Sequence, residues 1–277
     1  MTKPVRALPS RCLLFALLSL GVLAAAPRHP AAAATAPAAS SVLQRALRRY
    51  GHATLLKTLP GPPGMTAALV AVGGQKAVVW MIGTGDTATV AVGDVWDSKG
   101  RNLTRAMAIR MGLLPRPLPP ATVAARLAHA KTFVLGSGGP EIIVFFDPNC
   151  IFCHRLYLAA QPLLAAGRLR LRVVLVGFLK PSSAGRAAAI LMASDPARAL
   201  ARDERRFDVA AEEGGIAPAS AVPAAIAAAV GANTKLLAAS GLEATPTLLF
   251  RDHAGVWQII HHAPARGLDH LVASLRG

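Results

Sequence analysis

Residues 141–154 read E-I-I-V-F-F-D-P-N-C-I-F-C-H. The run E-I-I-V-F-F is continuously apolar after its first residue, which is typical of a strand that is covered on both faces. Pro148 and Asn149 favour a turn that leads from this strand into a helix. The spacing of the two cysteines then places Cys150 at the start of the helix and Cys153 one turn inside it.

The segments that follow predict a β-α-β order and then a β-β-α ending. The further expected elements are a strand at 169–176, a hairpin of strands at 247–251 and 256–260, and a closing helix at 267–276. The Ala-rich stretch at about 181–240 is broken by proline and glycine, which indicates a helical insertion. We therefore expect residues 132–277 to form an α/β domain with a mixed sheet and the thioredoxin arrangement.

A smaller β-rich (α+β) unit precedes this domain. Residues 65–96 contain short apolar stretches between glycine turns, which predicts a meander of strands. A unit at 41–114 buries little surface, so we expect it to pair with a second copy or to pack on a larger domain. Clustered prolines mark a boundary, and residues 115–131 are expected to hold a linker helix.

The N-terminus has the order of a secretory signal peptide. Positive residues without an acid precede an apolar run at 12–23, and small residues follow it. The run is short for a membrane span, so we expect a cleavable signal peptide at 1–26 and an exported chain. The Ala/Pro-rich stretch at 27–40 is expected to be a flexible leader.

Export places the cysteines in an oxidising compartment. Cys12 lies in the expected signal peptide, so Cys150 and Cys153 are the cysteines of the mature chain. Free N–H groups and the dipole at a helix start favour a thiolate there. We therefore expect Cys150 to attack disulfides and Cys153 to resolve the mixed disulfide.

Three other uses of C-I-F-C-H are open. A structural disulfide over so short a loop would restrict the unfolded chain little. A zinc site needs four ligands, and the histidines show no paired spacing beyond His261-His262. Covalent haem attachment fits the spacing and His154, but a buried strand that runs into the motif does not suit a small haem-binding helix bundle. We expect no metal and no cofactor, and His154 is expected either to tune Cys153 or to face solvent.

The formal net charge of the 277-residue chain is +16. Acidic partners or anionic membrane surfaces would suit a basic exported protein. The positive residues are mostly scattered arginines, which favours a solvated basic surface. Since no nucleic-acid-binding motif accompanies them, nucleic acid is not expected among the partners.

A second signal lies at Ala244-Thr245-Pro246-Thr247, directly before an expected strand. Cis peptide bonds occur at X-Pro, and proline is tolerated at the first position of a strand. An ordinary trans proline would explain this tetrapeptide alone. Together with C-x-x-C after a strand and the β-β-α ending, the pattern favours a cis bond at Pro246.

Three stretches together resemble the periplasmic thiol–disulfide isomerases of the DsbC/DsbG family. They are F-F-D-P-N-C-I-F-C-H at 145–154, L-V-G-F-L-K-P-S-S-A-G-R-A-A-A-I-L-M-A-S-D-P at 175–196 and A-T-P-T-L-L-F at 244–250. The second stretch is closest to the DsbG branch. P-G-P-P-G-M at 60–65 and D-S-K-G-R-N-L-T at 97–104 are similar to the family's N-terminal dimerisation domain.

The resemblance implies a V-shaped homodimer in which a linker helix joins each thioredoxin-fold catalytic domain to a dimerisation domain. It also implies a dithiol that a membrane reductase of the DsbD type keeps reduced. Thr245 and Pro246 would lie against the cysteines and bind the backbone of an extended substrate. The surroundings of the dithiol would be Asp147, Pro148, Asn149, Ile151, Phe152 and His154.

The chain departs from this family at several points. Ile151-Phe152 stands where the DsbG branch usually has Pro-Tyr, and the additional disulfide of the DsbC branch is missing. Many thioredoxin-like proteins carry a buried acid six residues before the first cysteine, where this chain has Val144. Proton transfer to and from Cys153 would then use water or another group. The positive charge also differs from the acidic cleft expected of the DsbG branch.

These observations predict a periplasmic thiol–disulfide oxidoreductase that isomerises or reduces disulfides in exported proteins with cysteines. The resemblance also favours the reduction of single sulfenylated cysteines. A chaperone-like binding module without turnover and a c-type haem protein are the alternatives from other classes. Cys150→Ala would abolish the enzyme activities and spare a chaperone activity.

Overall fold

The computed structural model describes residues 36–262, 264 and 267–275. The expected signal peptide (1–26) lies outside the described residues, as does the first part of the expected leader. The first helix, α1 (Ala36–Leu47), begins inside that leader (27–40). The chain divides into two compact units, and the division falls between Ala108 and Ile109. In the part of the chain that the structure describes, no helix is long and apolar enough to cross a membrane.

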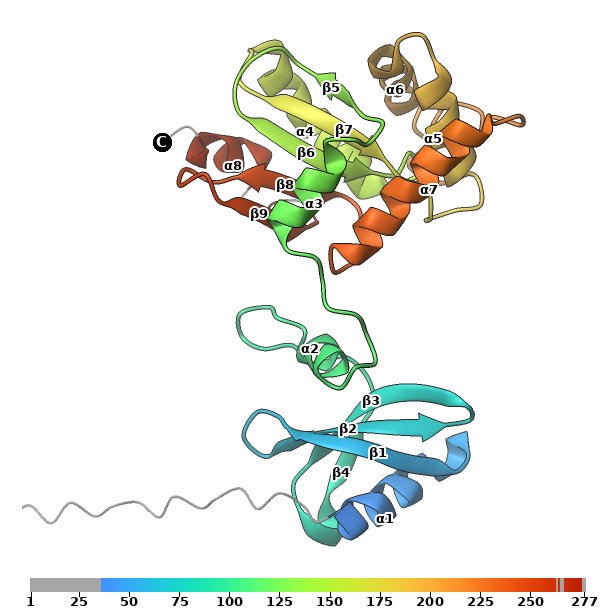
Figure 1. Cartoon of the computed structure of the whole chain (residues 1–277), viewed down its shortest axis with the longest axis vertical. Coiled ribbons are helices and arrows are strands. Elements are labelled where there is room, and N and C mark those ends of the chain that lie inside the picture. The colour runs from blue at the N-terminus through green and yellow to red at the C-terminus, as the bar shows by residue number, and fades with distance from the viewer. Residues whose placement is uncertain (1–35, 263, 265–266, 276–277) are drawn as a thin grey trace, which may run out of the picture. The chain divides into compact units, whose positions relative to one another are not determined.

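The first unit consists of α1 and a four-stranded antiparallel sheet (Figure 1). Its further elements are η1 (Arg48–Tyr50), β1 (Ala53–Pro60), β2 (Met65–Val72), β3 (Gln75–Ile82), η2 (Gly85–Thr87) and β4 (Thr89–Ala91), and α2 (Leu103–Arg110) follows them. Gly73 and Gly74, which join β2 to β3, have φ values of 56° and 79°. Glycine adopts these angles without strain, and two such residues suit a tight hairpin. The predicted meander of strands with glycine turns is confirmed.

The core of this unit is small. Leu43 and Leu47 of α1 are buried against the face of the sheet that carries Val79. Trp80 points to the opposite face, because neighbouring strand residues alternate. It is fully buried, and its indole N–H donates to Thr104 Oγ1 of α2 at 2.7 Å. Both faces of the sheet are therefore partly covered by helices.

The second unit is built on a mixed sheet of order β5-β7-β6-β8-β9. Its elements are α3 (Pro120–Leu127), β5 (Phe133–Leu135), β6 (Glu141–Phe146), α4 (Ile151–Ala165), β7 (Arg170–Leu175), α5 (Ser183–Met192), α6 (Pro196–Arg205), α7 (Ala224–Ala239), β8 (Thr247–Arg251), β9 (Trp257–His261) and α8 (Leu268–Ser274). The strands β6 and β7 are parallel and joined by α4, whereas β8 is antiparallel to β6 and forms a hairpin with β9. This is the thioredoxin fold with α5, α6 and α7 inserted, so the predicted fold class is confirmed.

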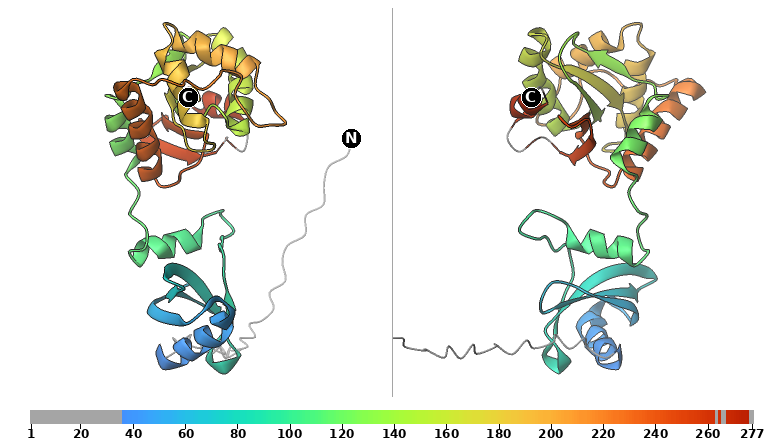
Figure 2. Two further views of the ribbon diagram at one scale, coloured as in Figure 1. Left: turned by 90° about the vertical axis from the view of Figure 1, so that its right-hand side faces the viewer. Right: turned by 60° about the vertical axis from the view of Figure 1, so that its left-hand side comes forward.

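The central strand β6 supports a core on each face of the sheet. Ile142 and Val144 belong to the core that includes residues of α4 and α8. Ile143 and Phe145 belong to the core that includes residues of α3 and α7. Figure 2 shows the sheet with helices on both sides. Because both faces are covered, the strand is apolar along almost its whole length.

The helix α3 is a packed part of the second unit. It lies within the stretch expected to form a linker helix (115–131) and spans Pro120–Leu127. Val123 and Leu127 are buried in the same core as Ile143 of the central strand. The helix α3 is therefore held to the sheet of the second unit.

Candidate active site

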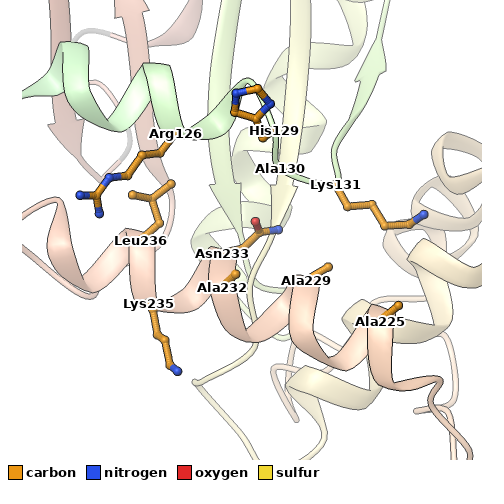
Figure 3. A pocket seen from close by; sticks show the side chains of 10 residues that line it. All are labelled: Arg126, His129, Ala130, Lys131, Ala225, Ala229, Ala232, Asn233, Lys235 and Leu236. Carbon is orange, nitrogen blue, oxygen red and sulfur yellow. The ribbon is translucent and has the colours of Figure 1, made fainter.

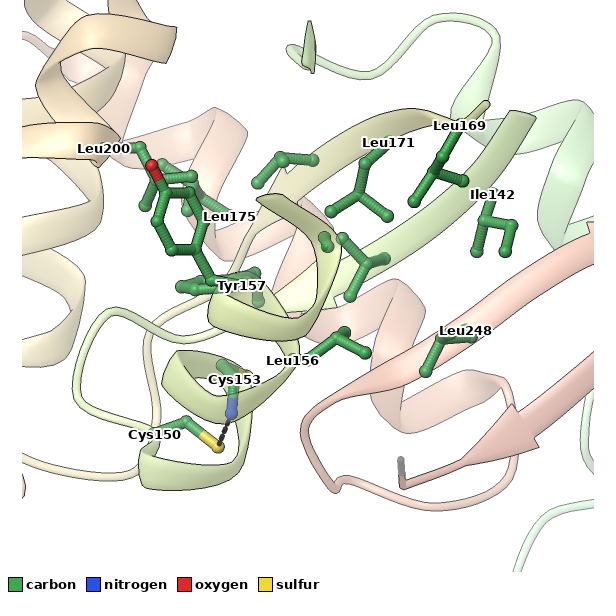
Figure 4. Packing of buried hydrophobic residues seen from close by; sticks show 14 of the residues in the cluster. Ile142, Cys150, Cys153, Leu156, Tyr157, Leu169, Leu171, Leu175, Leu200 and Leu248 are labelled. Carbon is green, nitrogen blue, oxygen red and sulfur yellow. Dashed lines mark hydrogen bonds between the residues drawn. The ribbon is translucent and has the colours of Figure 1, made fainter. Parts of the chain in front are cut away.

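Cys150 stands at the carboxyl end of β6, where it caps the N-terminus of α4. Its backbone is extended (φ −89°, ψ 112°), and its sulfur accepts the N–H of Cys153 at 3.3 Å (Figure 4). The first N–H groups of a helix have no partner within the helix, so a sulfur here takes the place of the usual oxygen cap. Both cysteines are free thiols, 4% and 0% exposed.

The two thiols differ in acidity. Hydrogen bonding from the Cys153 side chain lowers the pKa of Cys150 to about 7 against the opposing effect of burial, and the backbone N–H groups of Cys153 and Phe152 contribute in the same direction. Burial raises the pKa of Cys153 well above its ordinary value, and the neighbouring Cys150 adds to this rise. Near neutral pH, much of Cys150 is therefore ionised while Cys153 keeps its proton. An attacking thiol beside a resolving thiol requires this asymmetry.

The loop before β8 lies against the first thiol. The Thr245–Pro246 peptide bond is cis, as predicted. The Cys150 thiol donates to the carbonyl oxygen of Thr245 at 3.3 Å. Thr247 closes the loop, since its hydroxyl donates to the Ala244 carbonyl at 2.7 Å. The fold thus brings the C-x-x-C motif and the T-P motif together, although they lie far apart in the sequence.

Asp147 fixes the turn between β6 and α4. Its carboxyl group is fully buried and accepts the N–H groups of Asn149 at 2.9 Å, Phe178 at 2.9 Å and Leu179 at 3.1 Å. These bonds tie the residues before Cys150 to the loop after β7. Asp147 therefore positions the helix start and has no exposed oxygen to offer a substrate.

Asn149 joins the same turn to the helical insertion. Its amide donates to the hydroxyls of Ser182 and Ser183 at 2.9 Å each, and its oxygen accepts the N–H of Gly214 at 3.1 Å. A side chain at Gly214 would come within 2.7 Å of the Pro148 carbonyl oxygen. The close approach of the two backbones therefore requires glycine at this position.

Ile151 and Phe152 separate the cysteines and lie differently. Ile151 is nearly buried, whereas Phe152 is 54% exposed. The guanidinium of Arg155 lies 5.6 Å from the centroid of the Phe152 ring. The motif thus presents an apolar ring with a cationic neighbour beside Cys150.

His154 points into the protein and is 9% exposed. Its Nδ1 lies 2.7 Å from Oε2 of Glu204, and its ring stacks on Phe207 with centroids 4.4 Å apart. The alternative that His154 faces solvent is therefore wrong. A histidine held in this way is not placed to bind a haem iron, which also weighs against the c-type haem interpretation.

Two buried carboxyl groups of α6 were missed by the sequence reasoning. Burial, together with the charges of Asp203 and Cys150, raises the pKa of Glu204 to about 9. Burial also raises the pKa of Asp203 to about 6. The run R-D-E-R-R at 202–206 resembles a solvated helix surface. The available signal was the helical spacing from Leu200, which puts both acids on the buried face of α6.

A separate pocket of about 560 Å³ lies between α3 and α7 (Figure 3). Its charged lining residues are Arg126, His129, Lys131 and Lys235, the histidine counted as a potential cation. Neither cysteine nor the cis-proline loop contributes to it, so this pocket is not part of the thiol site.

The acidity of Cys150 should depend on the hydrogen bond from its partner. Cys153→Ala removes the thiol donor and keeps the backbone N–H that also contacts the Cys150 sulfur, so the pH midpoint for alkylation of Cys150 should rise above about 7. Cys153→Ser keeps an O–H donor and should hold the midpoint close to that of the native protein. The rate of iodoacetamide addition to Cys150, read by mass spectrometry between about pH 5 and about pH 10, measures it. Equal midpoints in the two variants would contradict the assignment.

Glu204 should make the folded protein less stable as the pH rises. The folded protein keeps the carboxyl proton up to about pH 9, whereas the unfolded chain loses it near the ordinary pKa of 4.5. The folded state therefore binds more protons in this window, and the free energy of unfolding falls across it. Glu204→Gln should raise that free energy by about 3 kcal/mol near pH 7 and by little below about pH 4. Urea unfolding at both pH values checks this, and an equal effect at both would contradict it.

No family model matches the chain. The thiol:disulfide interchange protein DsbG of Pseudomonas aeruginosa is 26% identical over 214 residues, which cover 76% of this chain and 80% of the relative. The DsbG protein of Escherichia coli K12 is 29% identical over 156 residues, or 56% and 60% of the two chains. A periplasmic thioredoxin-like protein from Salmonella enterica serovar Typhimurium is 19% identical, with a TM-score of 0.44 over 56% of this chain and 94% of that one. The chain is therefore similar in sequence to DsbG proteins, and its own sheet order is that of a thioredoxin fold.

Proposed function

We propose that this protein is a thiol–disulfide oxidoreductase that acts on disulfides of other proteins through Cys150 and Cys153. The observation that carries the proposal is the asymmetry of the two thiols at the start of α4. Cys150 has a lowered pKa and contacts the cis-proline loop, whereas Cys153 is fully buried with a raised pKa. The sequence similarity to two DsbG proteins supports the same activity.

The reaction begins with the Cys150 thiolate. It attacks one sulfur of a substrate disulfide, a mixed disulfide forms, and the other substrate sulfur leaves as a thiolate that takes up a proton. In isomerisation, a substrate thiolate then attacks the mixed disulfide and releases Cys150. In reduction, Cys153 loses its proton and attacks the Cys150 sulfur, which releases the second substrate thiolate and leaves a Cys150–Cys153 disulfide.

The substrate is proposed to lie along the cis-proline loop as an extended segment. Thr245 and Pro246 border Cys150, so a chain that pairs with their backbone would bring its sulfur to the thiolate. Phe152 provides an exposed aromatic ring on α4. These contacts are independent of sequence or only weakly dependent on it, and they suit an enzyme that accepts different protein substrates.

We further propose a periplasmic location, with the expected signal peptide at 1–26 removed on export. The similarity to DsbG proteins supports the location, and the order of charged, apolar and small residues supports the signal. A membrane reductase of the DsbD type is the proposed source of electrons. An isomerase needs such a partner because it works only while Cys150 is reduced.

The first unit is proposed to be a dimerisation domain, with residues 41–114 as its extent and 115–131 as the link to the catalytic domain at 132–277. A pocket of about 380 Å³ in this unit has an apolar lining apart from Gln75. Tyr50 and Val92 at this pocket are 53% and 64% exposed. Exposed apolar surface of this kind supports an interface with a second copy.

Light scattering tests the dimer. The full chain should have twice the mass of one chain at micromolar concentration, and Val92→Asp should shift it toward the monomer because it places a charge in the apolar surface. Ser98→Asp, which adds the same charge at an exposed loop position outside the pocket, is the control. A monomeric native chain at micromolar concentration would rule out the homodimer.

The alternatives receive less support. Reduction of a sulfenylated cysteine would begin with the same thiolate attack, and no described residue favours it over disulfide exchange. A binding module without turnover does not require one thiol with a lowered pKa beside another with a raised pKa.

Trapping of mixed disulfides tests the proposed activity. Cys153→Ser removes the resolving thiol, so protein substrates should accumulate as covalent adducts on Cys150 that a reductant releases. Cys150→Ser is the matched control and should trap none. The adducts are counted on non-reducing gels and identified by mass spectrometry. Equal trapping by both variants, or trapping by neither, would overturn the proposed activity.

A further inference from the structure

Glu204 and His154 form a buried pair beside the thiols. Glu204 lies on α6, is 2% exposed, and has Oε2 at 2.7 Å from the imidazole Nδ1. His154 directly follows Cys153 on the first turn of α4. The central strand carries the fully buried Val144 six residues before Cys150. The buried carboxyl group of Asp147, just after this strand, is bound to backbone N–H groups. The helical insertion therefore supplies a buried carboxyl group that the exchange steps above do not use.

Burial keeps this pair neutral. Desolvation lowers the pKa of His154 and raises the pKa of Glu204, so at neutral pH the carboxyl group is protonated and donates to Nδ1. The other carboxyl oxygen, Oε1, is buried without a hydrogen-bond partner. An ionised carboxylate with an unpaired buried oxygen is much less stable than a protonated one. Geometry and electrostatics therefore agree on a shared, retained proton.

Several other charged groups surround the pair. Asp203, its neighbour on α6, raises the pKa of the acid, and Arg186 of α5 partly offsets the charge of Asp203. On α4, Arg155 lowers the pKa of the imidazole. Burial raises the pKa of Tyr157, with a further rise from the acid and an opposing effect of Arg205. Asp147, which precedes α4, also raises the pKa of Asp203.

Cys150 is the neighbour whose charge does change. Its thiolate raises the pKa of Glu204, and coupling of this kind is reciprocal, so a protonated Glu204 favours the thiolate. We propose that the Glu204–His154 pair holds its proton more tightly while Cys150 is a thiolate than while Cys150 is in a disulfide. This inference rests on the proposed function, because only a dithiol that cycles changes its charge in this way.

The proton balance of one reduction follows. Two electrons from an external dithiol break the Cys150–Cys153 bond, and the external dithiol becomes a disulfide and gives up two protons. Cys153 takes one proton, and Cys150 becomes a thiolate above about pH 7. Near neutral pH the second proton goes to the solvent, because the pair is already protonated in the oxidised protein; the pair takes it only at a pH at which it was ionised there. At neutral pH the pair stays protonated and keeps a second negative charge away from the thiolate. Glu204 is thus a positioning residue that acts through the charge of Cys150.

The test is a carboxyl titration by NMR in the full-length native chain. The glutamates of the chain are Glu141, Glu204, Glu212, Glu213 and Glu243. With ¹³C-carboxyl-labelled glutamate, one resonance of the dithiothreitol-reduced protein should titrate near pH 9. The same resonance should titrate at a lower pH in the oxidised protein, because the thiolate charge is gone.

Two variants complete the experiment. Glu204→Gln should remove the shifted resonance, whereas Glu212→Gln, an exposed acid of the same insertion, should leave it in place. If Glu204→Gln does not fold, the comparison of the shifted resonance in the reduced and oxidised native protein still tests the inference. Five resonances that titrate in the ordinary range, or a shifted one with the same midpoint in both redox states, would overturn the inference alone. Failure of the native chain to form a Cys150–Cys153 disulfide would overturn the proposed function as well.

Discussion

The site depends on one constraint, the placement of a sulfur atom at the N-terminus of α4. The unpaired N–H groups of the first helical turn need an acceptor, and Cys150 is the residue that caps them. A cysteine in this position has its negative charge stabilised without a metal or a basic side chain. Cys153, one turn further in, is buried by the same helix and so keeps its proton. The division of roles between two identical side chains therefore comes from the helix geometry.

Buried polar bonds hold the rest of the second unit to this helix start. The side chains of Asp147 and Asn149 form hydrogen bonds with backbone and hydroxyl groups of the loop after β7 and of the insertion. Arg186 donates to the carbonyl oxygens of Gly214 and Ile216. Such groups are stable in the interior only when they are paired. Glu204 departs from this pattern, since one of its oxygens has no partner and its buried proton lowers stability above its ordinary pKa. Single unpartnered atoms also occur in Arg186, Asp203 and Thr245. A group that destabilises the fold beside a reactive thiol is better explained by the thiol than by the fold.

Most of the thioredoxin fold could be predicted because its signals are local. The apolar run of β6, the turn at Asp147–Asn149 and the X-Pro before β8 each have a short-range physical cause. The packing of α3 on the sheet and the start of α1 at Ala36 depend on neighbours distant in sequence. The contact between His154 and Glu204 spans 50 positions in the sequence. The arginines on both sides of Glu204 are typical of a solvent-exposed helix surface. Sequence periodicity predicts which face of α6 is buried, but it does not predict which residues that face contacts.

The central claim is that Cys150 and Cys153 form a reversible redox pair in which Cys150 is the cysteine that reacts with external thiols and disulfides. Equilibration of the full-length chain with a series of glutathione buffers, followed by acid quenching and peptide mass spectrometry, tests it most directly. The account predicts one transition between two free thiols and an internal Cys150–Cys153 disulfide, with a minor glutathione adduct on Cys150. Thiols that stay free across the whole series, or an adduct that forms on Cys153, would contradict it.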